Sequence, residues 1–410
     1  MTASGSEHYR TVPPAKAATA TMIVFTFPGQ GSQKPGMGDA WRDHPSWELV
    51  AEASSVLGRD LEHLLLHTEA EELTRTDNAQ LSTFLTSLIV LDAVERLGVE
   101  PAAAAGHSLG EYTALVASGA LAFDEGLTLV AERGAAMLEA TTARIGTMAA
   151  VLGLDDDDVE AACARVDGDV WVANYNAPGQ VVIAGDPDAV SRASEIAKEL
   201  GAKKVMSMAV SGAFHTPFMA PARDRLRSAI GTADLRDADL PVYANVDARA
   251  HVGTEWTDLL NAQLCSPVRW RQILHNLGDN GATVFVELGP GNVLTGMAKR
   301  TVTGTTTLSV STPDDLDKLL TALASPSESV AVHEGEHLFA TERMVVSPAA
   351  GVFTPAAELA PGFELTPGTV LGMVGDHEVR SPFAGILVGV LAVDGERVTT
   401  SQPIAWLRTA

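Results

Sequence analysis

Basic residues and cysteines are scarce in this chain of 410 residues. Lys and Arg number 28 against 52 Asp and Glu, which gives a formal net charge of -24 at pH 7. Nucleic-acid phosphates require a basic face, so the composition excludes a nucleic-acid partner. Only Cys163 and Cys265 are present, too few and too far apart for a disulfide framework or a thiolate metal site. We therefore expect no metal, and a reducing cytoplasm is the compartment that fits.

Long hydrophobic runs are also missing. A membrane-spanning helix needs about 20 consecutive apolar residues, and no run in the sequence approaches that length. Residues 1–21 have no apolar centre like that of a signal peptide, and they predict a flexible tail with Met22 as an alternative start. These features predict a soluble protein without a membrane partner.

From Met22 onward, short β-rich runs alternate with longer helical periods, which is the pattern of an α/β protein. The run MIVFTF (22–27) predicts a buried strand, and the Gly-rich turn PGQGSQ follows it. Within residues 145–210, three strand-like runs (MAAVLGL, VWVANYNAPGQVVIAG and KKVMSMAV) are separated by two helical ones. We expect a strand-helix-strand-strand-helix-strand subdomain with an antiparallel sheet, inserted in a domain spanning residues 22–312.

The C-terminal part differs from the rest of the chain in its composition and sequence pattern. Residues 324–343 are rich in small and acidic residues without periodicity, and they predict a linker. Beyond it, VVSPAAGV (345–352) recurs as VRSPFAGI (379–386), each copy followed by a Gly turn and an apolar run. This duplication predicts that residues 344–410 form a small all-β barrel of two similar halves.

The most specific local signal is Gly106-His107-Ser108-Leu109-Gly110, a G-x-S-x-G between a strand-like run and a helical period. In that setting the glycines allow a sharp turn that projects a nucleophilic Ser108; a Gly/Ser turn without chemistry is the alternative. The candidate for the base that a serine nucleophile needs is His215, in SGAFHTPFM, although from spacing alone a packed loop histidine is the better interpretation. Arg133 falls on the inward side of a helical period, where it either pairs with a bound anion or forms a structural salt bridge.

Six motifs occur in order: FPGQGSQ (27–33), GHSLGEY (106–112), RGAAM (133–137), GAFHTPFM (212–219), QLCSPVRW (263–270) and ELGPGNVLTG (287–296). Together they closely resemble the malonyl-CoA:acyl carrier protein transacylases, a family related to the acyltransferase domains of polyketide synthases. The resemblance implies a hydrolase-like large subdomain with an inserted ferredoxin-like small subdomain. It also implies ping-pong transfer of malonyl from coenzyme A to an acyl carrier protein in fatty acid biosynthesis. No cofactor is expected, because the coenzyme A thioester is a substrate.

The same resemblance assigns roles to individual residues. Ser108 is the nucleophile and His215 the base, which the backbone carbonyl at Gln263 orients; for Gln263 an ordinary helix-end amide is the alternative. The backbone N–H groups of Gln30 and Leu109 form the oxyanion hole, and Arg133 binds the free malonyl carboxylate.

Specificity and docking can be predicted in the same way. Phe214 before the histidine and Leu109 after the serine resemble malonyl-specific rather than methylmalonyl-specific enzymes. Because carrier proteins are acidic, docking needs a local basic face. The candidates are Lys203 with Lys204, Arg223 with Arg225 and Arg227, and Lys299 with Arg300. Solvated surface charge is the alternative for each group.

The C-terminal segment resembles biotinyl/lipoyl carrier domains, with one departure. Those domains present a lysine for the prosthetic group on a hairpin between the two halves, where this chain has residues 373–379 (MVGDHEV). No lysine follows Lys318, so no amide-linked group can form there. The module is predicted to act in docking, with an acyl-CoA carboxylase or synthase component as partner, or as a cap. For the whole chain, a free-standing acyltransferase serving a polyketide synthase and a non-catalytic scaffold are the alternative functions.

Overall fold

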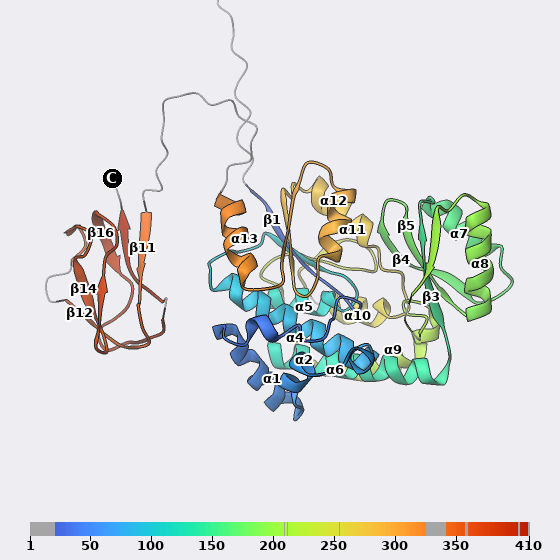
Figure 1. The fold of residues 1–410 in the computed structure, drawn as a ribbon, viewed down its shortest axis with the longest axis horizontal. Helices are drawn as coiled ribbons and strands as arrows, with labels where there is room; N and C mark the ends of the chain where they lie inside the picture. The colour runs from blue at the N-terminus through green and yellow to red at the C-terminus, as the bar shows by residue number, and fades with distance from the viewer. Residues whose placement is uncertain are drawn as a thin grey trace, which may run out of the picture. The chain divides into compact units, whose positions relative to one another are not determined.

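The computed structural model describes residues 21–208, 210, 212–253, 255–324, 342–356, 360–400 and 402–408. The chain divides into two compact units, residues 1–326 and 327–410 (Figure 1). Nearly all of the predicted tail 1–21 and linker 324–343 lies outside the described residues. Among the helices in the described part of the chain, none is long and apolar enough to cross a membrane.

The first unit is built on a six-stranded sheet with the order β10-β9-β1-β2-β7-β8. The strands are β1 (Ile23–Phe27), β2 (Ala103–Gly106), β7 (Val242–Tyr243), β8 (Ala250–His251), β9 (Val284–Leu288) and β10 (Thr306–Val310). All neighbouring pairs from β10 to β7 are parallel, and only β8 runs antiparallel to its neighbour. The α/β architecture predicted from the sequence is confirmed by this sheet and the helices around it.

Helices cover both faces of this sheet because alternate strand residues point to opposite sides. Phe25 and Phe27 of β1 join one hydrophobic cluster with α4, α5 and α6, whereas Val24 joins a second cluster with α11 and α12. The helices of this unit outside the small subdomain are α1 (Glu48–Leu57), α2 (Leu61–Leu66), α3 (Ala70–Leu73), α4 (Thr76–Glu95), α5 (Gly110–Ala117), α6 (Phe123–Ala143), α9 (Ala220–Thr232), α10 (Trp256–Gln263), α11 (Trp270–Asp279), α12 (Val293–Thr301) and α13 (Asp314–Ala324).

The small subdomain has the element order predicted from the sequence. It contains β3 (Thr147–Leu152), α7 (Asp156–Ala164), β4 (Val170–Ala177), β5 (Gln180–Gly185), α8 (Pro187–Glu199) and β6 (Lys204–Ser207). The sheet order is β4-β5-β3-β6 and every pair is antiparallel. Its own core lies between this sheet and α7 and α8. Backbone hydrogen bonds from Tyr175 to Val268 and from Val268 to Ala173 attach β4 to the segment after α10.

The first unit extends past residue 312, where the sequence had suggested its end. Helix α13 packs on β10 and buries Leu316 and Leu319 in the main hydrophobic cluster. The helix begins at Asp314, within the segment STPDD (311–315), and the Asp315 carboxylate in its first turn accepts hydrogen bonds from the N–H groups of Ser311 and Thr312. An amphipathic helix so close to the predicted linker was overlooked because its polar first turn resembles a loop.

The second unit is all-β in the part of it that the structure describes. Its strands are β11 (Glu342–Val346), β12 (Gly351–Pro355), β13 (Glu364–Leu365), β14 (Val370–Val374), β15 (His377–Arg380), β16 (Gly385–Val390), β17 (Arg397–Val398) and β18 (Pro403–Arg408). They form two four-stranded sheets, β11-β18-β16-β13 and β15-β14-β12-β17. The buried residues of both sheets, among them Phe353 and Leu387, make one separate core.

The repeated sequence of this unit has a repeated structure. The hydroxyl of Ser347 donates to the carbonyl of Ala349 at 2.6 Å, and the hydroxyl of Ser381 donates to the carbonyl of Phe383 at 2.8 Å. Both serines are buried, each at the same place in its copy of the repeat. The two halves therefore use the same local contact to turn the chain after β11 and β15.

Candidate active site

Ser108 lies on a sharp turn between β2 and α5, with a backbone φ of +53°. A Cβ at Gly106 would meet the carbonyl carbon of Gly110 at 1.8 Å, and a Cβ at Gly110 would meet the carbonyl oxygen of Phe27 at 2.1 Å. No side chain fits at either position, so the two glycines of the motif are required by close backbone contacts. The turn leaves the serine hydroxyl at the carboxyl end of a parallel strand.

His215 contacts the serine directly, with 2.7 Å between its Nε2 and the Ser108 Oγ. It lies in the loop after β6 with φ at +61°, and Thr216 stabilises this loop by donating its hydroxyl to the carbonyl of Ala213. The Nδ1 of His215 lies 3.0 Å from the backbone carbonyl of Gln263. A carbonyl oxygen only accepts, so Nδ1 carries the proton and Nε2 is free to accept one from the serine.

The imidazole of His215 is buried, and this sets its charge. Burial, together with the smaller effect of the nearby Arg133 charge, lowers the pKa of His215 to about 3. The ring is therefore neutral at physiological pH, which is the form that acts as a general base.

Arg133 on α6 is 1% exposed and reaches the same serine. Its Nη2 donates to the Ser108 Oγ at 3.1 Å and to the Gln263 Oε1 at 2.9 Å, and its Nη1 donates to the Gln80 Oε1 at 2.7 Å. Its Nε has no hydrogen-bond partner among the described residues. Within the described ranges, the ion pairs that the structure contains do not include Arg133. The structural salt bridge considered from the sequence is thus not present, and the site holds a buried cation without a carboxylate partner.

The two backbone groups predicted to form an oxyanion hole lie on adjacent turns. A Cβ at Gly29 would fall 2.5 Å from the carbonyl oxygen of His107, so the turn after β1 touches the turn that carries Ser108. Leu109 is the residue before the first turn of α5, where helix N–H groups point outward. Among the described residues, neither the N–H of Gln30 nor that of Leu109 has a hydrogen-bond partner.

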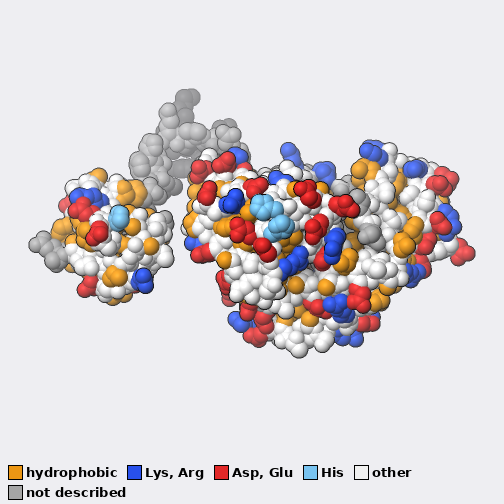
Figure 2. All heavy atoms as spheres, turned by 60° about the horizontal axis from the view of Figure 1, so that its bottom comes forward, with side chains coloured by type: hydrophobic (Ala, Val, Ile, Leu, Met, Phe, Trp, Pro, Cys, Tyr) orange, Lys and Arg blue, Asp and Glu red, His pale blue; other side chains and the backbone are white. Residues whose placement is uncertain are grey.

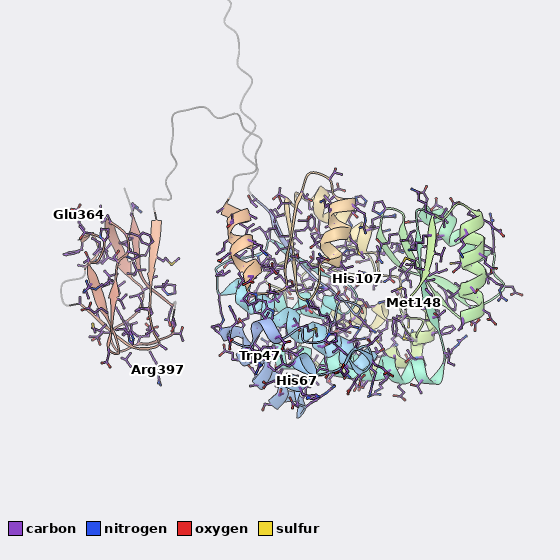
Figure 3. All side chains as sticks on the ribbon, in the orientation of Figure 1. Trp47, His67, His107, Met148, Glu364 and Arg397 are labelled. Carbon is purple, nitrogen blue, oxygen red and sulfur yellow. The ribbon has the colours of Figure 1, made fainter. Side chains whose placement is uncertain are left out.

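A cavity of about 560 Å³ opens beside His215 and is lined mainly by the small subdomain and by the segment after α10. Trp171, Tyr175 and Cys265 are among its lining residues. Figure 3 labels His107, next to the catalytic turn, and Met148 on β3 of the small subdomain. His107 joins the two subdomains because its Nε2 lies 2.9 Å from the Oδ1 of Asn176 on β4. Phe214, predicted to limit the acyl group, is buried in the same hydrophobic cluster as Leu109.

Three buried polar residues of the site were missed by the sequence analysis: Gln80 on α4, Glu111 on α5 and Asn245 after β7. Gln80 holds Arg133, and Asn245 accepts a hydrogen bond from the N–H of Ser108 at 2.7 Å. Burial raises the pKa of Glu111 to about 8, opposed by hydrogen bonds from Asn245 and Gln263 that favour the anion. For Glu111 the available signal was its position three residues after the serine, whereas Gln80 lies in a helix with many other polar residues and does not stand out in the sequence.

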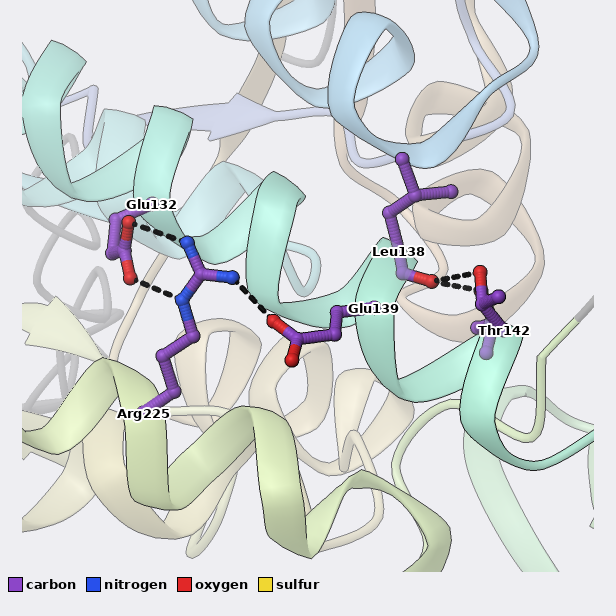
Figure 4. Close-up of polar contacts among 6 residues, drawn as sticks. Glu132, Leu138, Glu139, Thr142 and Arg225 are labelled. Atoms are coloured by element: carbon purple, nitrogen blue, oxygen red, sulfur yellow. Dashed lines mark hydrogen bonds and ion pairs between the residues drawn. The ribbon is translucent and has the colours of Figure 1, made fainter.

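The basic groups suggested as a docking face differ in their surroundings. Arg225 on α9 is held by two glutamates of α6, with 2.6 Å from its Nε to Glu132 and 2.6 Å from its Nη1 to Glu139 (Figure 4). Arg223 and Arg227 both approach Asp224. Figure 2 shows acidic and basic side chains mixed over the face that it presents, without a single basic field.

Lysines are less constrained than these arginines. Within the described part of the chain, Lys203, Lys204 and Lys299 take part in no ion pair, whereas Arg300 donates to the Oε1 of Gln180 at 2.6 Å. Of the predicted groups, the lysines therefore have the charge most available to an acidic partner.

Comparison with known proteins agrees with this geometry. Residues 24–322 match the family described as acyl transferase domain. The malonyl CoA-acyl carrier protein transacylase of Bacillus subtilis (strain 168) is 42% identical over 315 residues, covering 75% of this chain and 99% of that protein. The enzyme of the same name from Escherichia coli (strain K12) is 40% identical over 300 residues, covering 72% and 97%.

Solved structures show the same fold for the first unit. The structure of the malonyl CoA-acyl carrier protein transacylase from Coxiella burnetii is 36% identical, with a TM-score of 0.72, and covers 74% of this chain and 98% of that one. A malonyl-transacylase in complex with its type II polyketide synthase acyl-carrier protein is also 36% identical, with a TM-score of 0.71 and coverage of 74% and 100%.

Proposed function

The chain belongs to the acyl transferase family, and from this premise we propose that it transfers malonyl from malonyl-CoA to the phosphopantetheine thiol of an acyl carrier protein. The observation that carries the proposal is the grouping of three side chains. The Ser108 Oγ lies 2.7 Å from the Nε2 of the neutral His215 and 3.1 Å from the Nη2 of Arg133, a buried arginine outside the ion pairs of the described residues. A nucleophile, a base and a cation without a direct carboxylate contact are what transfer of an acyl group with a free carboxylate requires.

The first half-reaction forms a covalent intermediate on Ser108. Its Oγ attacks the thioester carbonyl while the Nε2 of His215 takes the hydroxyl proton. The Nδ1 of His215 donates to the carbonyl of Gln263, which keeps the ring in the correct tautomer and stabilises the imidazolium that forms. The C–S bond then breaks, and the proton on His215 passes to the coenzyme A thiolate.

The tetrahedral intermediate carries a negative oxygen that needs prearranged donors. The N–H groups of Gln30 and Leu109 are proposed to supply them, since both lie beside the serine turn with their hydrogen-bonding capacity unused among the described residues. The loss of one such donor typically costs about 100- to 1000-fold in rate. In the second half-reaction the carrier-protein thiol gives its proton to His215 and attacks malonyl-Ser108 by the same steps in reverse.

Selectivity is proposed to come from charge and from volume. The planar guanidinium of Arg133 matches a carboxylate, and acetyl-CoA would leave this buried cation unpaired. Phe214 is proposed to exclude a methyl branch at the α-carbon, a steric difference of about 1 to 3 kcal/mol. No cofactor is needed for these steps, because the thioester supplies the activated acyl group.

We propose fatty acid biosynthesis as the pathway, since the relatives are named malonyl CoA-acyl carrier protein transacylases, and the cytoplasm as the compartment, since both cysteines are free thiols. The relative bound to a polyketide carrier protein supports service to a polyketide synthase as a second candidate. Comparison of malonylation rates on the two kinds of carrier protein distinguishes the pathways. A non-catalytic scaffold would behave identically in all assays after Ser108→Ala.

For the second unit we propose a degenerate biotinyl/lipoyl-like module that docks a carboxylase or a synthase component, or else caps the enzyme. The repeated Ser347 and Ser381 contacts support two related halves. Strands β14 and β15 are joined by a two-residue turn, Gly375-Asp376, so the hairpin is short as well as free of lysine. Pulldown with the full-length chain tests docking: capture of a carboxylase or synthase subunit, lost on deletion of residues 342–410, supports it. Retention of neither subunit argues for a cap.

Covalent loading tests the proposed transferase. Intact-protein mass after incubation with malonyl-CoA is expected to show one malonyl adduct, absent in Ser108→Ala and discharged by a phosphopantetheinylated carrier protein. A folded protein that forms no adduct contradicts the proposal.

A further inference from the structure

Glu111 is a fully buried carboxylate that the proposed reaction does not use. It lies in the first turn of α5, three residues after Ser108, and is 0% exposed. Its Oε1 accepts a hydrogen bond from the backbone N–H of Asn245 at 2.6 Å, and its Oε2 accepts one from the Nε2 of Gln263 at 2.5 Å. Burial disfavours the charged form of this carboxyl group while its two N–H donors favour it, so its presence beside the reactive serine calls for a reason.

Both partners of Glu111 hold the backbone of Ser108. The Oδ1 of Asn245 accepts from the Ser108 N–H at 2.7 Å, and the Nε2 of Gln263 donates to the Ser108 carbonyl at 2.8 Å. Asn245 also donates its Nδ2 to the carbonyl of Gly106 at 2.7 Å, which fixes its amide orientation. Ser108 has a φ of +53°, a conformation that costs free energy for a residue other than glycine. The side-chain amides of Asn245 and Gln263 therefore bind the backbone N–H and the backbone carbonyl of this strained residue.

The same network reaches the cation. Gln263 presents its Oε1 to the Nη2 of Arg133 at 2.9 Å, so its Nε2 must face Glu111 and Ser108. The backbone carbonyl of Gln263 meanwhile orients His215. One carboxylate therefore fixes the residue that contacts the nucleophile, the base and the malonyl-binding arginine.

We propose that Glu111 is a positioning residue for acylation of Ser108: its two oxygens fix Asn245 and Gln263, which hold the N–H and the carbonyl of the serine. The inference rests on the proposed acyl transfer and adds a residue to that site. It requires a carboxylate, because both groups that face Glu111 are N–H donors. An amide at position 111 would turn its own NH₂ toward one of them. If Gln263 flipped to accept from it, its NH₂ would then meet the guanidinium of Arg133.

Glu111→Gln is the test, because it keeps the volume and removes one acceptor. The variant loses a charge-assisted hydrogen bond that holds the serine in place. We therefore expect malonyl-Ser108 to form about 10- to 100-fold more slowly in a single turnover. The apparent KM for malonyl-CoA should change much less than this rate, since the serine is misplaced while the cleft is intact. The matched control is Glu287→Gln: Glu287 is also a buried glutamate, but it binds the N–H and hydroxyl of Thr295 at the start of α12. It should alter thermal stability and leave the malonylation rate within about twofold.

A double-mutant cycle separates positioning from general loss of structure. Glu111 acts in part through Asn245. The product of the fold-decreases in rate caused by Glu111→Gln and by Asn245→Ala should therefore exceed the fold-decrease measured in the double variant. Fully multiplicative losses, or an unchanged malonylation rate in folded Glu111→Gln, overturn the inference. Should Glu111→Gln fail to fold, Glu111→Asp carries the same test, because the shorter side chain cannot reach both donors and the same slowing is expected. Failure of the wild type to form any adduct contradicts the proposed function instead, so the two failures are distinguishable.

Discussion

The replacement of Arg133 by methionine is the perturbation that most sharply separates malonyl binding from acyl transfer in general. Methionine keeps most of the buried volume and removes the guanidinium, which is 1% exposed and bonded to Gln80 and Gln263. A carboxylate held by a planar fork makes two charge-assisted hydrogen bonds, each worth about 1.5 to 3 kcal/mol. Their loss lowers kcat/KM for malonyl-CoA by about 10²- to 10⁴-fold, at roughly 1.4 kcal/mol per tenfold change.

Acetyl-CoA has no carboxylate, so the substitution removes no hydrogen bond from it. The variant also has no buried cation that bound acetyl-CoA would leave unpaired. Acylation by acetyl-CoA should therefore be maintained or should rise in Arg133→Met, so that the preference for malonyl collapses. The assay is the second-order rate of adduct formation with each thioester, followed by intact-protein mass. Arg133→Lys is the control, since it keeps the charge but loses the fork and should retain part of the preference. A folded Arg133→Met that still prefers malonyl-CoA by the wild-type factor refutes the assignment of this residue.

Four further outcomes are expected. Phe214→Ala should raise the rate with methylmalonyl-CoA relative to malonyl-CoA by about 10- to 100-fold, measured by competition between the two thioesters, because a bulky buried ring is removed. Gly110→Ala should give little folded protein by circular dichroism, because its Cβ would lie 2.1 Å from the carbonyl oxygen of Phe27; normal folding would contradict the reported contact. The pKa of His215 is lowered to about 3, so the base stays neutral as the pH falls, and protonation of His215 should contribute no acid limb to the malonylation rate between pH 7 and 5. The unfolded histidine titrates near 6.5, so this group makes the folded state progressively less stable as the pH falls from about 6.5 toward 3, and His215→Gln should flatten that dependence in thermal melts.

The features that could be predicted from the sequence are those that depend on residues close together in the chain. The glycines around Ser108 predict a turn, and the order of β-rich and helical runs within residues 145–210 predicts the small subdomain. The sheet order β10-β9-β1-β2-β7-β8 could not be read in this way, because the pairing of parallel strands is set by packing across long stretches of sequence.

The hydrogen bonds that hold the backbone of Ser108 could not be predicted from the sequence either. Asn245 lies 137 residues after Ser108, and only tertiary structure brings its side chain to the serine N–H. Gln263 was expected to act through its backbone carbonyl alone, whereas its side chain also contacts Ser108 and Arg133. Isolated amides carry no periodic signal, so hydrogen bonds of this kind become visible only when both partners are placed.

The most direct test of the central claim is the intact-protein mass of the full chain after exposure to malonyl-CoA and then to a phosphopantetheinylated acyl carrier protein. We expect one malonyl group on Ser108, absent in Ser108→Ala, followed by its complete transfer to the carrier thiol. A malonyl adduct that persists in Ser108→Ala, or no adduct on folded wild-type protein, would contradict the account.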